Sequence, residues 1–126
     1  MYFDHERLDV YRVAMELIVL VDEIIEQLPR GRGYLTDQLH RAGTSMLLNV
    51  AEGAGEYAEN EKMRFYRMAR RSGTETAAIL ELGKNLKLID EARYGKSREL
   101  LIRIISMLTK MTRESVTVTP TVTVTN

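Results

Sequence analysis

The segment between residues 61 and 71 holds the side chains best suited to direct contact with a charged ligand. Its basic members are a lysine and four arginines at helical spacing: Lys62, Arg64, Arg67, Arg70 and Arg71. Arginines spaced in this way can bind phosphate groups from one side of a helix, and the interleaved Phe65 and Tyr66 can stack on bases. A solvated face whose arginines pair with an acidic helix of the same or a neighbouring subunit explains the same pattern. The overall balance of 18 basic and 18 acidic residues favours this second interpretation, but both stay open.

Residues for catalysis are few. His5 and His40 are the only histidines, and each has charged neighbours in the sequence, which is typical of surface residues. Asp37-x-x-His40 is the only approximation to the Glu-x-x-His motif, which a di-metal site in a helical bundle needs twice. The chain has no cysteine, so a thiolate nucleophile or metal ligand is excluded. The sequence therefore predicts no enzymatic activity, no cofactor and no metal site.

A line of polar residues follows one face of the predicted helix upstream of the arginines. These residues, at steps of three and four, are Gln38, Arg41, Ser45, Asn49 and Glu52. A parallel apolar line at the same spacing indicates the buried face: Leu35, Leu39, Ala42, Met46 and Val50. Ser72 and Glu75 on the next, antiparallel helix are natural partners of the polar line, and an Arg41 fork to Glu75 would fix the register of the two helices. We expect these polar residues to stabilise bundle or subunit geometry.

The same stretch resembles the bacterial family of four-helix-bundle proteins encoded in 23S ribosomal RNA intervening sequences. Members carry a segment like LT-x-QL-x-RA-x-x-S-x-x-x-N-(I/V)-AEG-x-G, followed by RF-x-x-x-A-x-G-S-x-x-E. The first segment is matched here by Leu35, Thr36, Gln38, Leu39, Arg41, Ala42, Ser45, Asn49, Val50, Ala51, Glu52, Gly53 and Gly55. The second is matched by Arg64, Phe65, Ala69, Ser72 and Glu75, with Arg71 where the family usually has glycine.

The resemblance implies an all-α fold, an up-down-up-down antiparallel four-helix bundle. Related bundles include the accessory proteins of diversity-generating retroelements, which look like ring-shaped homopentamers that bind a reverse transcriptase and nucleic acid. The resemblance therefore implies copies of the chain itself as partners, in a ring of five. It also brings RNA or a reverse transcriptase ribonucleoprotein into consideration as a partner.

Length and charge fit one globular domain with uneven charge along the chain. Residues 1–29 hold seven acids and two bases, whereas residues 59–90 carry seven bases against five acids. Such an asymmetry can help subunits attract one another. The longest apolar run in the first helix, residues 17–21, is too short to span a bilayer, and the acidic start is unlike a secretory signal. We expect a cytoplasmic protein without a membrane partner.

Hydrophobic periodicity and helix-breaking residues predict four helices. Their expected ranges are residues 4–28, 36 to 53 or 56, 60–88, and a last helix capped by Asp90 that ends near residue 113. The first helix carries apolar residues outside its main stripe: Val13, Met15, Val19 and Leu20. The third is rich in small residues, which let a neighbouring helix approach: Ala69, Ser72, Gly73, Thr76, Ala77 and Gly83.

The bundle and the C-terminal tail have different expected roles. Residues 1–114 are predicted to form the bundle, and residues 115–126, SVTVTPTVTVTN, a disordered tail; a minority interpretation is addition to the edge of another protein's sheet. A ring of subunits would account for the surplus apolar residues of the first helix and the small residues of the third. We therefore expect a self-associating scaffold or interaction module, with an RNA- or DNA-binding accessory module as the alternative.

Overall fold

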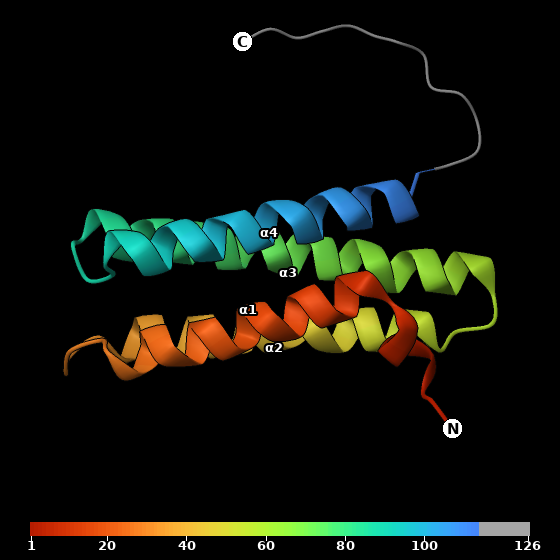
Figure 1. Ribbon diagram of the computed structural model, residues 1–126, viewed down its shortest axis with the longest axis horizontal. Coiled ribbons are helices and arrows are strands. Elements are labelled where there is room, and N and C mark those ends of the chain that lie inside the picture. Colours follow the sequence, from red (N-terminus) through yellow and green to blue (C-terminus); the bar gives the residue numbers. More distant parts are fainter. Residues whose placement is uncertain (114–126) are drawn as a thin grey trace, which may run out of the picture.

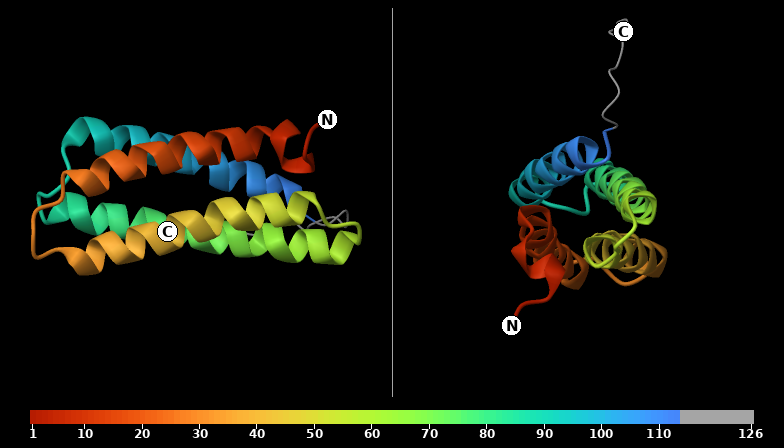
Figure 2. Two further views of the ribbon diagram at one scale, coloured as in Figure 1. Left: turned by 90° about the horizontal axis from the view of Figure 1, so that it is seen from below. Right: turned by 90° about the vertical axis from the view of Figure 1, so that its right-hand side faces the viewer.

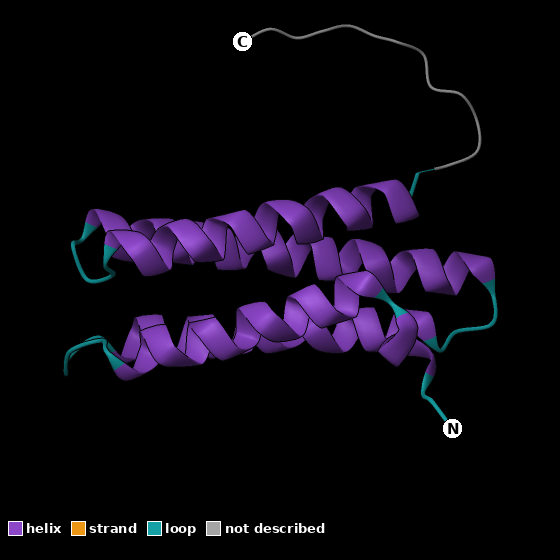
Figure 3. Ribbon diagram, in the orientation of Figure 1, coloured by secondary structure: helices purple, strands orange, loops and turns teal. Residues whose placement is uncertain are grey.

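The chain folds into four helices that lie side by side along their length (Figures 1 and 3). The computed structural model describes residues 1–113, so the expected tail at 115–126 lies outside the described residues. After a 3-10 turn, η1, the four helices follow one another along the chain: η1 (Asp4–Arg7), α1 (Asp9–Glu26), α2 (Gly33–Ala54), α3 (Glu59–Asn85) and α4 (Glu91–Met111). Within residues 1–113, no helix is both long and apolar enough to cross a membrane.

Each helix packs against two others, and the end view shows the four at the corners of a square (Figure 2). In the described part of the chain, α1 contacts α2 and α4, and α3 also contacts α2 and α4. In the diagonal pairs, α1 with α3 and α2 with α4, no Cα atoms of the two helices lie within 8 Å of each other. This arrangement confirms the predicted antiparallel four-helix bundle.

The apolar stripes predicted from the sequence form the core. All five members of the α2 stripe are buried, each with 2% or less of its surface exposed. Val13 was expected outside the main stripe of α1, but it is 6% exposed and belongs to the core, so that expectation was wrong. Met15 and Val19, by contrast, are 39% and 56% exposed. The surplus apolar surface of α1 therefore exists, with Met15 and Val19 as its exposed members.

The boundaries of α1, α2 and α3 differ from the predicted ones by a few residues. Leu8 is extended, with φ −91° and ψ 130°, and separates η1 from α1, because η1 packs against α2 instead of continuing the axis of α1. Helix α2 begins at Gly33, three residues before the predicted start at residue 36. Helix α3 ends at Asn85, and Lys87 then takes a left-handed conformation with φ 62°. The predicted cap of α4 is confirmed, since Asp90 accepts a hydrogen bond from the backbone N–H of Arg93.

Three glycines allow close packing inside the bundle. A Cβ at Gly53 would lie 2.7 Å from Cε1 of Tyr66, and one at Gly83 would lie 2.6 Å from Cδ1 of Ile89. A Cβ at Gly73 would lie 3.0 Å from Cδ1 of Ile105. Side chains of the same bundle therefore fill the space beside Gly73 and Gly83 on α3, and a second subunit is not needed to explain these two glycines.

Candidate functional site

A chain of hydrogen bonds joins the middle of α2 to the middle of α3. The Ser45 and Ser72 hydroxyl oxygens are 2.9 Å apart. Asn49 donates from Nδ2 to the Ser45 carbonyl at 2.8 Å and to its hydroxyl at 3.2 Å, one turn along α2. On α3, Thr76 donates to the Ser72 carbonyl at 2.8 Å. The structure thus brings together the short polar residues that the sequence pattern singled out.

The longer members of the predicted network stay apart. Gln38, Arg41, Glu52 and Glu75 are exposed, and in residues 1–113 none of them makes a side-chain hydrogen bond or an ion pair. The predicted Arg41–Glu75 fork is therefore not formed within one chain. All four side chains are exposed, and Glu75 lies beside Ser45 and Ser72.

Three of the five basic candidates have partners in their own chain. Lys62 donates from Nζ to the carbonyls of Gly53 at 3.0 Å and Ala54 at 3.2 Å, so it caps the C-terminus of α2. Arg64 pairs with Glu61 at 2.9 Å, and Arg70 donates to the Thr112 hydroxyl of α4 at 3.1 Å. Lys62, Arg64 and Arg70 are therefore engaged by groups of their own chain.

Electrostatics around Arg64 reflect the same local pairing. The hydrogen bond and charge of Glu61 raise the pKa of the Arg64 guanidinium, and the charges of Glu56 and Glu52 add to the effect. The same hydrogen bond lowers the pKa of the Glu61 carboxyl. The start of α3 is therefore a mixed acidic and basic surface.

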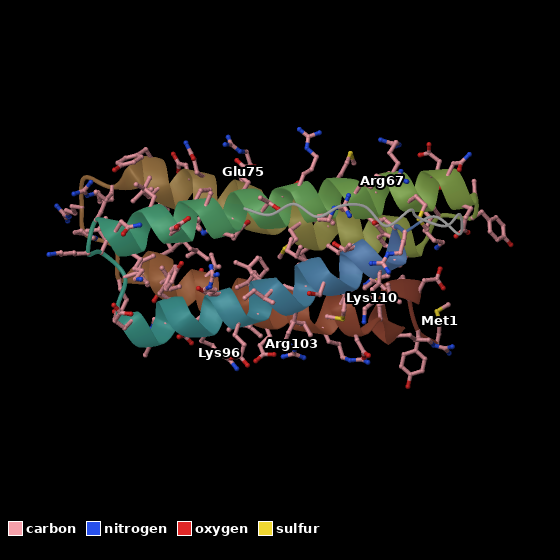
Figure 4. The ribbon with its side chains drawn as sticks, turned by 90° about the horizontal axis from the view of Figure 1, so that it is seen from above. Met1, Arg67, Glu75, Lys96, Arg103 and Lys110 are labelled. Atoms are coloured by element: carbon pink, nitrogen blue, oxygen red, sulfur yellow. The ribbon has the colours of Figure 1, made fainter. Side chains whose placement is uncertain are left out.

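Arg67 and Arg71 are the two basic candidates that differ from the other three. Both are exposed, and neither makes a hydrogen bond or ion pair with any residue that the structure describes. Figure 4 shows Arg67 on α3, on the outside of the bundle. The acids of α1 cannot reach these arginines in the same chain, because α1 and α3 occupy diagonal corners of the bundle (Figure 2). Pairing with the acids of α1 in the same chain therefore does not explain these two arginines.

Exposed apolar side chains gather on α1 and α2. Met15 and Val19 lie one turn apart on α1, and Leu48 of α2 is 54% exposed. Ile18 of α1 and Leu47 of α2 are half-buried and pack against the core. We refer to these five residues as the α1/α2 apolar face.

The remaining two sides of the bundle differ in character. Two ion pairs cross from α1 to α4, Glu23 with Arg93 at 3.6 Å and Glu16 with Lys96 at 4.0 Å. Between α3 and α4 runs a groove with a volume of about 250 Å³. We refer to it as the α3/α4 groove; its lining includes Thr74, Leu101, Ile102, Ile105 and Ser106. Neither the ion pairs nor the groove was predicted, since both depend on how α3, α4 and α1 are rotated in the bundle.

The two histidines lie apart from these surfaces. His5 in η1 packs against Tyr11, with ring centroids 4.5 Å apart, and stacks on Phe3 at 5.7 Å. His40 is exposed on α2. Across residues 1–113, no three His, Asp or Glu side chains are grouped closely enough to hold a metal ion.

Architecture and motif together define the class of protein, an antiparallel four-helix bundle with a polar α2/α3 seam. The family model of the 23S rRNA-intervening sequence proteins matches residues 6–110. The chain therefore belongs to the 23S rRNA-intervening sequence protein family.

A solved structure agrees with this assignment at the level of fold. It is a protein of unknown function from the S23 ribosomal protein family of Bacteroides thetaiotaomicron. The two chains share 20% identity, and the TM-score is 0.76 over 83% of this chain and 99% of the other. No curated protein matches the chain.

Proposed function

We propose that this protein is a non-enzymatic scaffold that assembles with copies of itself. The α1/α2 apolar face is the observation that carries the proposal. Met15, Val19 and Leu48 expose apolar surface on two adjacent helices, and an exposed apolar cluster is typical of a protein interaction site. Burying it against another subunit removes that surface from water.

Unpaired charges support a copy of the same chain as the partner. Asp22 and Glu26 are exposed on α1, and in the described residues neither has an ion-pair partner. Arg67 and Arg71 are likewise without partners on α3, on the opposite corner of the bundle. Contacts between different faces of neighbouring copies build closed rings or open arrays, whereas a twofold dimer uses one face twice. A ring of five, as the family resemblance implies, is the closed form that we propose.

Charged substitutions on the apolar face test this function. Val19→Asp combined with Leu48→Asp should dissociate the assembly to monomers, because carboxylates would be forced into an apolar interface. Both side chains are more than half exposed, so the fold should persist in circular dichroism spectra. Ile102→Asp is the matched control, because Ile102 is 53% exposed but belongs to α4. Equal particle masses for the native chain and the Val19/Leu48 variant would refute this role of the face.

Nucleic-acid binding is the second candidate function, and the free arginines of α3 favour it. Arg67 and Arg71 are one turn apart and available for phosphate contacts, and the Arg64 guanidinium lies 4.7 Å from the ring centroid of the neighbouring Phe65. With Lys62, Arg64 and Arg70 engaged within the chain, few phosphates can be contacted per subunit. Any RNA affinity would therefore have a shallow salt dependence for one subunit and a steeper one for a ring.

The two candidates are separated by titrating RNA at low and high salt. Replacing Arg67 and Arg71 with glutamine should reduce RNA binding if α3 contacts phosphates, while Arg103→Gln on α4 should leave it unchanged. If the assembled native protein binds no RNA, the nucleic-acid proposal is refuted and the scaffold function is the one that remains.

A further inference from the structure

The connection between α1 and α2 and the connection between α3 and α4 lie at the same end of the bundle (Figures 1 and 2). Gln27, just after α1, and Lys87, just after α3, line the same small cavity of about 250 Å³. Residues 27–36 and 82–89, which include the two connections, hold four basic residues and no acid. We refer to the four as the basic end: Arg30, Arg32, Lys84 and Lys87.

The charges of the basic end are available to a ligand. Arg30 and Lys87 are exposed, and within residues 1–113 no member of the basic end forms an ion pair with a carboxylate. Asp90, the first acid after the second stretch, is already paired with Arg93 at 2.8 Å. One end of the bundle therefore concentrates positive charge, although the chain as a whole has no net charge.

Lys87 occupies a backbone position that suits glycine. Its φ is 62°, and no other non-glycine residue in the described part of the chain has a positive φ. Its N–H donates to the Lys84 carbonyl at 2.9 Å, and the N–H of Leu88 donates to the Gly83 carbonyl at 2.9 Å. These are the hydrogen bonds of a Schellman motif, which usually has glycine at this position. A side chain here costs conformational energy, and strain of this kind is typical of functional positions.

The connection between α1 and α2 places an aromatic ring beside its positive charge. Arg32 donates from Nη1 to the Tyr34 hydroxyl at 3.0 Å. The Tyr34 side chain is large and apolar for most of its surface, yet the residue is 49% exposed. A guanidinium beside an exposed ring can contact a phosphate while the ring stacks on an unpaired base. This combination favours single-stranded nucleic acid over a duplex, in which the bases are already stacked.

We propose that the basic end binds single-stranded RNA through its phosphate backbone, with Tyr34 stacking on a base. The site is separate from the arginines of α3 considered above. Arg67 precedes Lys84 by 17 residues, which places the two about 25 Å apart along the helix axis at 1.5 Å per residue. Each chain carries the complete surface, so binding at the basic end does not depend on self-association.

Matched removal of charge tests the site. Arg30→Gln combined with Lys87→Gln removes two charges from the basic end. The control combines Arg103→Gln with Lys110→Gln, which removes two charges from exposed positions of α4 (Figure 4). Binding is measured by fluorescence anisotropy of a labelled single-stranded RNA of about 20 nucleotides, a length able to contact several phosphate-binding side chains, over a range of salt concentrations.

The Arg30/Lys87 variant should bind the RNA at least tenfold more weakly than the native protein at low salt. The slope of log affinity against log salt should become shallower by about 1.4, because each phosphate contact with a single strand contributes about 0.7. The Arg103/Lys110 control should keep the native slope and an affinity within about twofold of the native value, because its lost charges lie outside the proposed contact. Equal losses in the two double variants would overturn the proposal.

Lys87→Gly separates RNA binding from folding. Glycine relieves the strained backbone, so this variant should have a higher thermal midpoint than the native protein and still bind RNA more weakly. Unchanged RNA affinity of this variant would contradict a role for the Lys87 side chain. The whole proposal would be wrong if the native protein bound no RNA at low salt, or if it bound vesicles of anionic phospholipid and not the RNA.

Discussion

The Ser45 hydroxyl on α2 and the Ser72 hydroxyl on α3 lie 2.9 Å apart, 27 residues distant in sequence. The contact sits on the seam between two antiparallel helices, with Asn49 donating to Ser45 from one turn away. A one-turn slip of either helix would separate the two hydroxyls by about 5 Å. The pair therefore specifies the register in which α2 and α3 pack.

A double-mutant cycle measures this relationship. Ser45→Ala and Ser72→Ala should each lower the free energy of unfolding by about 1 kcal/mol, because each leaves a part-buried partner with fewer hydrogen bonds. The double variant should lose less than the sum, with a coupling energy above about 0.5 kcal/mol. Thr44→Ala, an exposed neighbour, serves as the control and should cost nothing. Strict additivity in urea unfolding would contradict a direct bond.

Two glycine substitutions separate close packing from helix propensity. Gly53→Ala should lower the free energy of unfolding by about 1–3 kcal/mol, because its Cβ would overlap the ring of Tyr66. Gly95→Ala in α4 should raise the free energy of unfolding by up to about 1 kcal/mol, because the Cβ meets no atom within 4 Å. Urea titrations of the two variants and the native protein measure both changes in the free energy of unfolding. Shifts of the same sign would show that the packing around Gly53 differs from this account.

Acid stability should depend on the cap of α4. The pKa of the Asp90 carboxyl lies below its ordinary value of 3.8, because it accepts hydrogen bonds from the backbone N–H and then the side chain of Arg93. A lowered folded-state pKa means that this stabilisation is complete above pH 3.8 and is lost as the pH falls through the folded-state pKa.

The measurement is the thermal midpoint of native and Asp90→Asn proteins between pH 7 and pH 2. Asparagine remains a capping residue but does not titrate. The thermal midpoint of the native protein should therefore exceed that of the Asp90→Asn variant by a constant amount near neutrality, and the difference should shrink below pH 3.8. If the difference between the two thermal midpoints grew on acidification, Arg93 would not be stabilising the charged form of the Asp90 carboxyl.

Much of the fold followed from local sequence patterns. The stripe from Leu35 to Val50 predicted which face of α2 is buried, and the Asp90 cap was visible from its residue type and position. The start of α1 was missed, because packing of η1 against α2 overrides the continuous helical pattern across Leu8. Periodicity reports which face is buried, but it carries no information on such a tertiary contact.

The polar surfaces were predictable only in part. Ser45 and Ser72 are short, so helix spacing alone brings their hydroxyls together. Long side chains have several possible partners within reach, and the rotation of the helices decides which partner each one contacts. Lys62 thus caps α2 and Arg70 bonds to Thr112, although both had been grouped with the exposed arginines. The sequence signal for the Lys62 contact was its position, just after a helix that ends without a basic residue.

The mass of the full-length native protein in solution tests the central proposal most directly. Light scattering at physiological salt should give about 72 kDa, five times the chain mass of 14.5 kDa. A particle of 14.5 kDa at micromolar concentration would contradict self-association, and a stable dimer would contradict the ring of five.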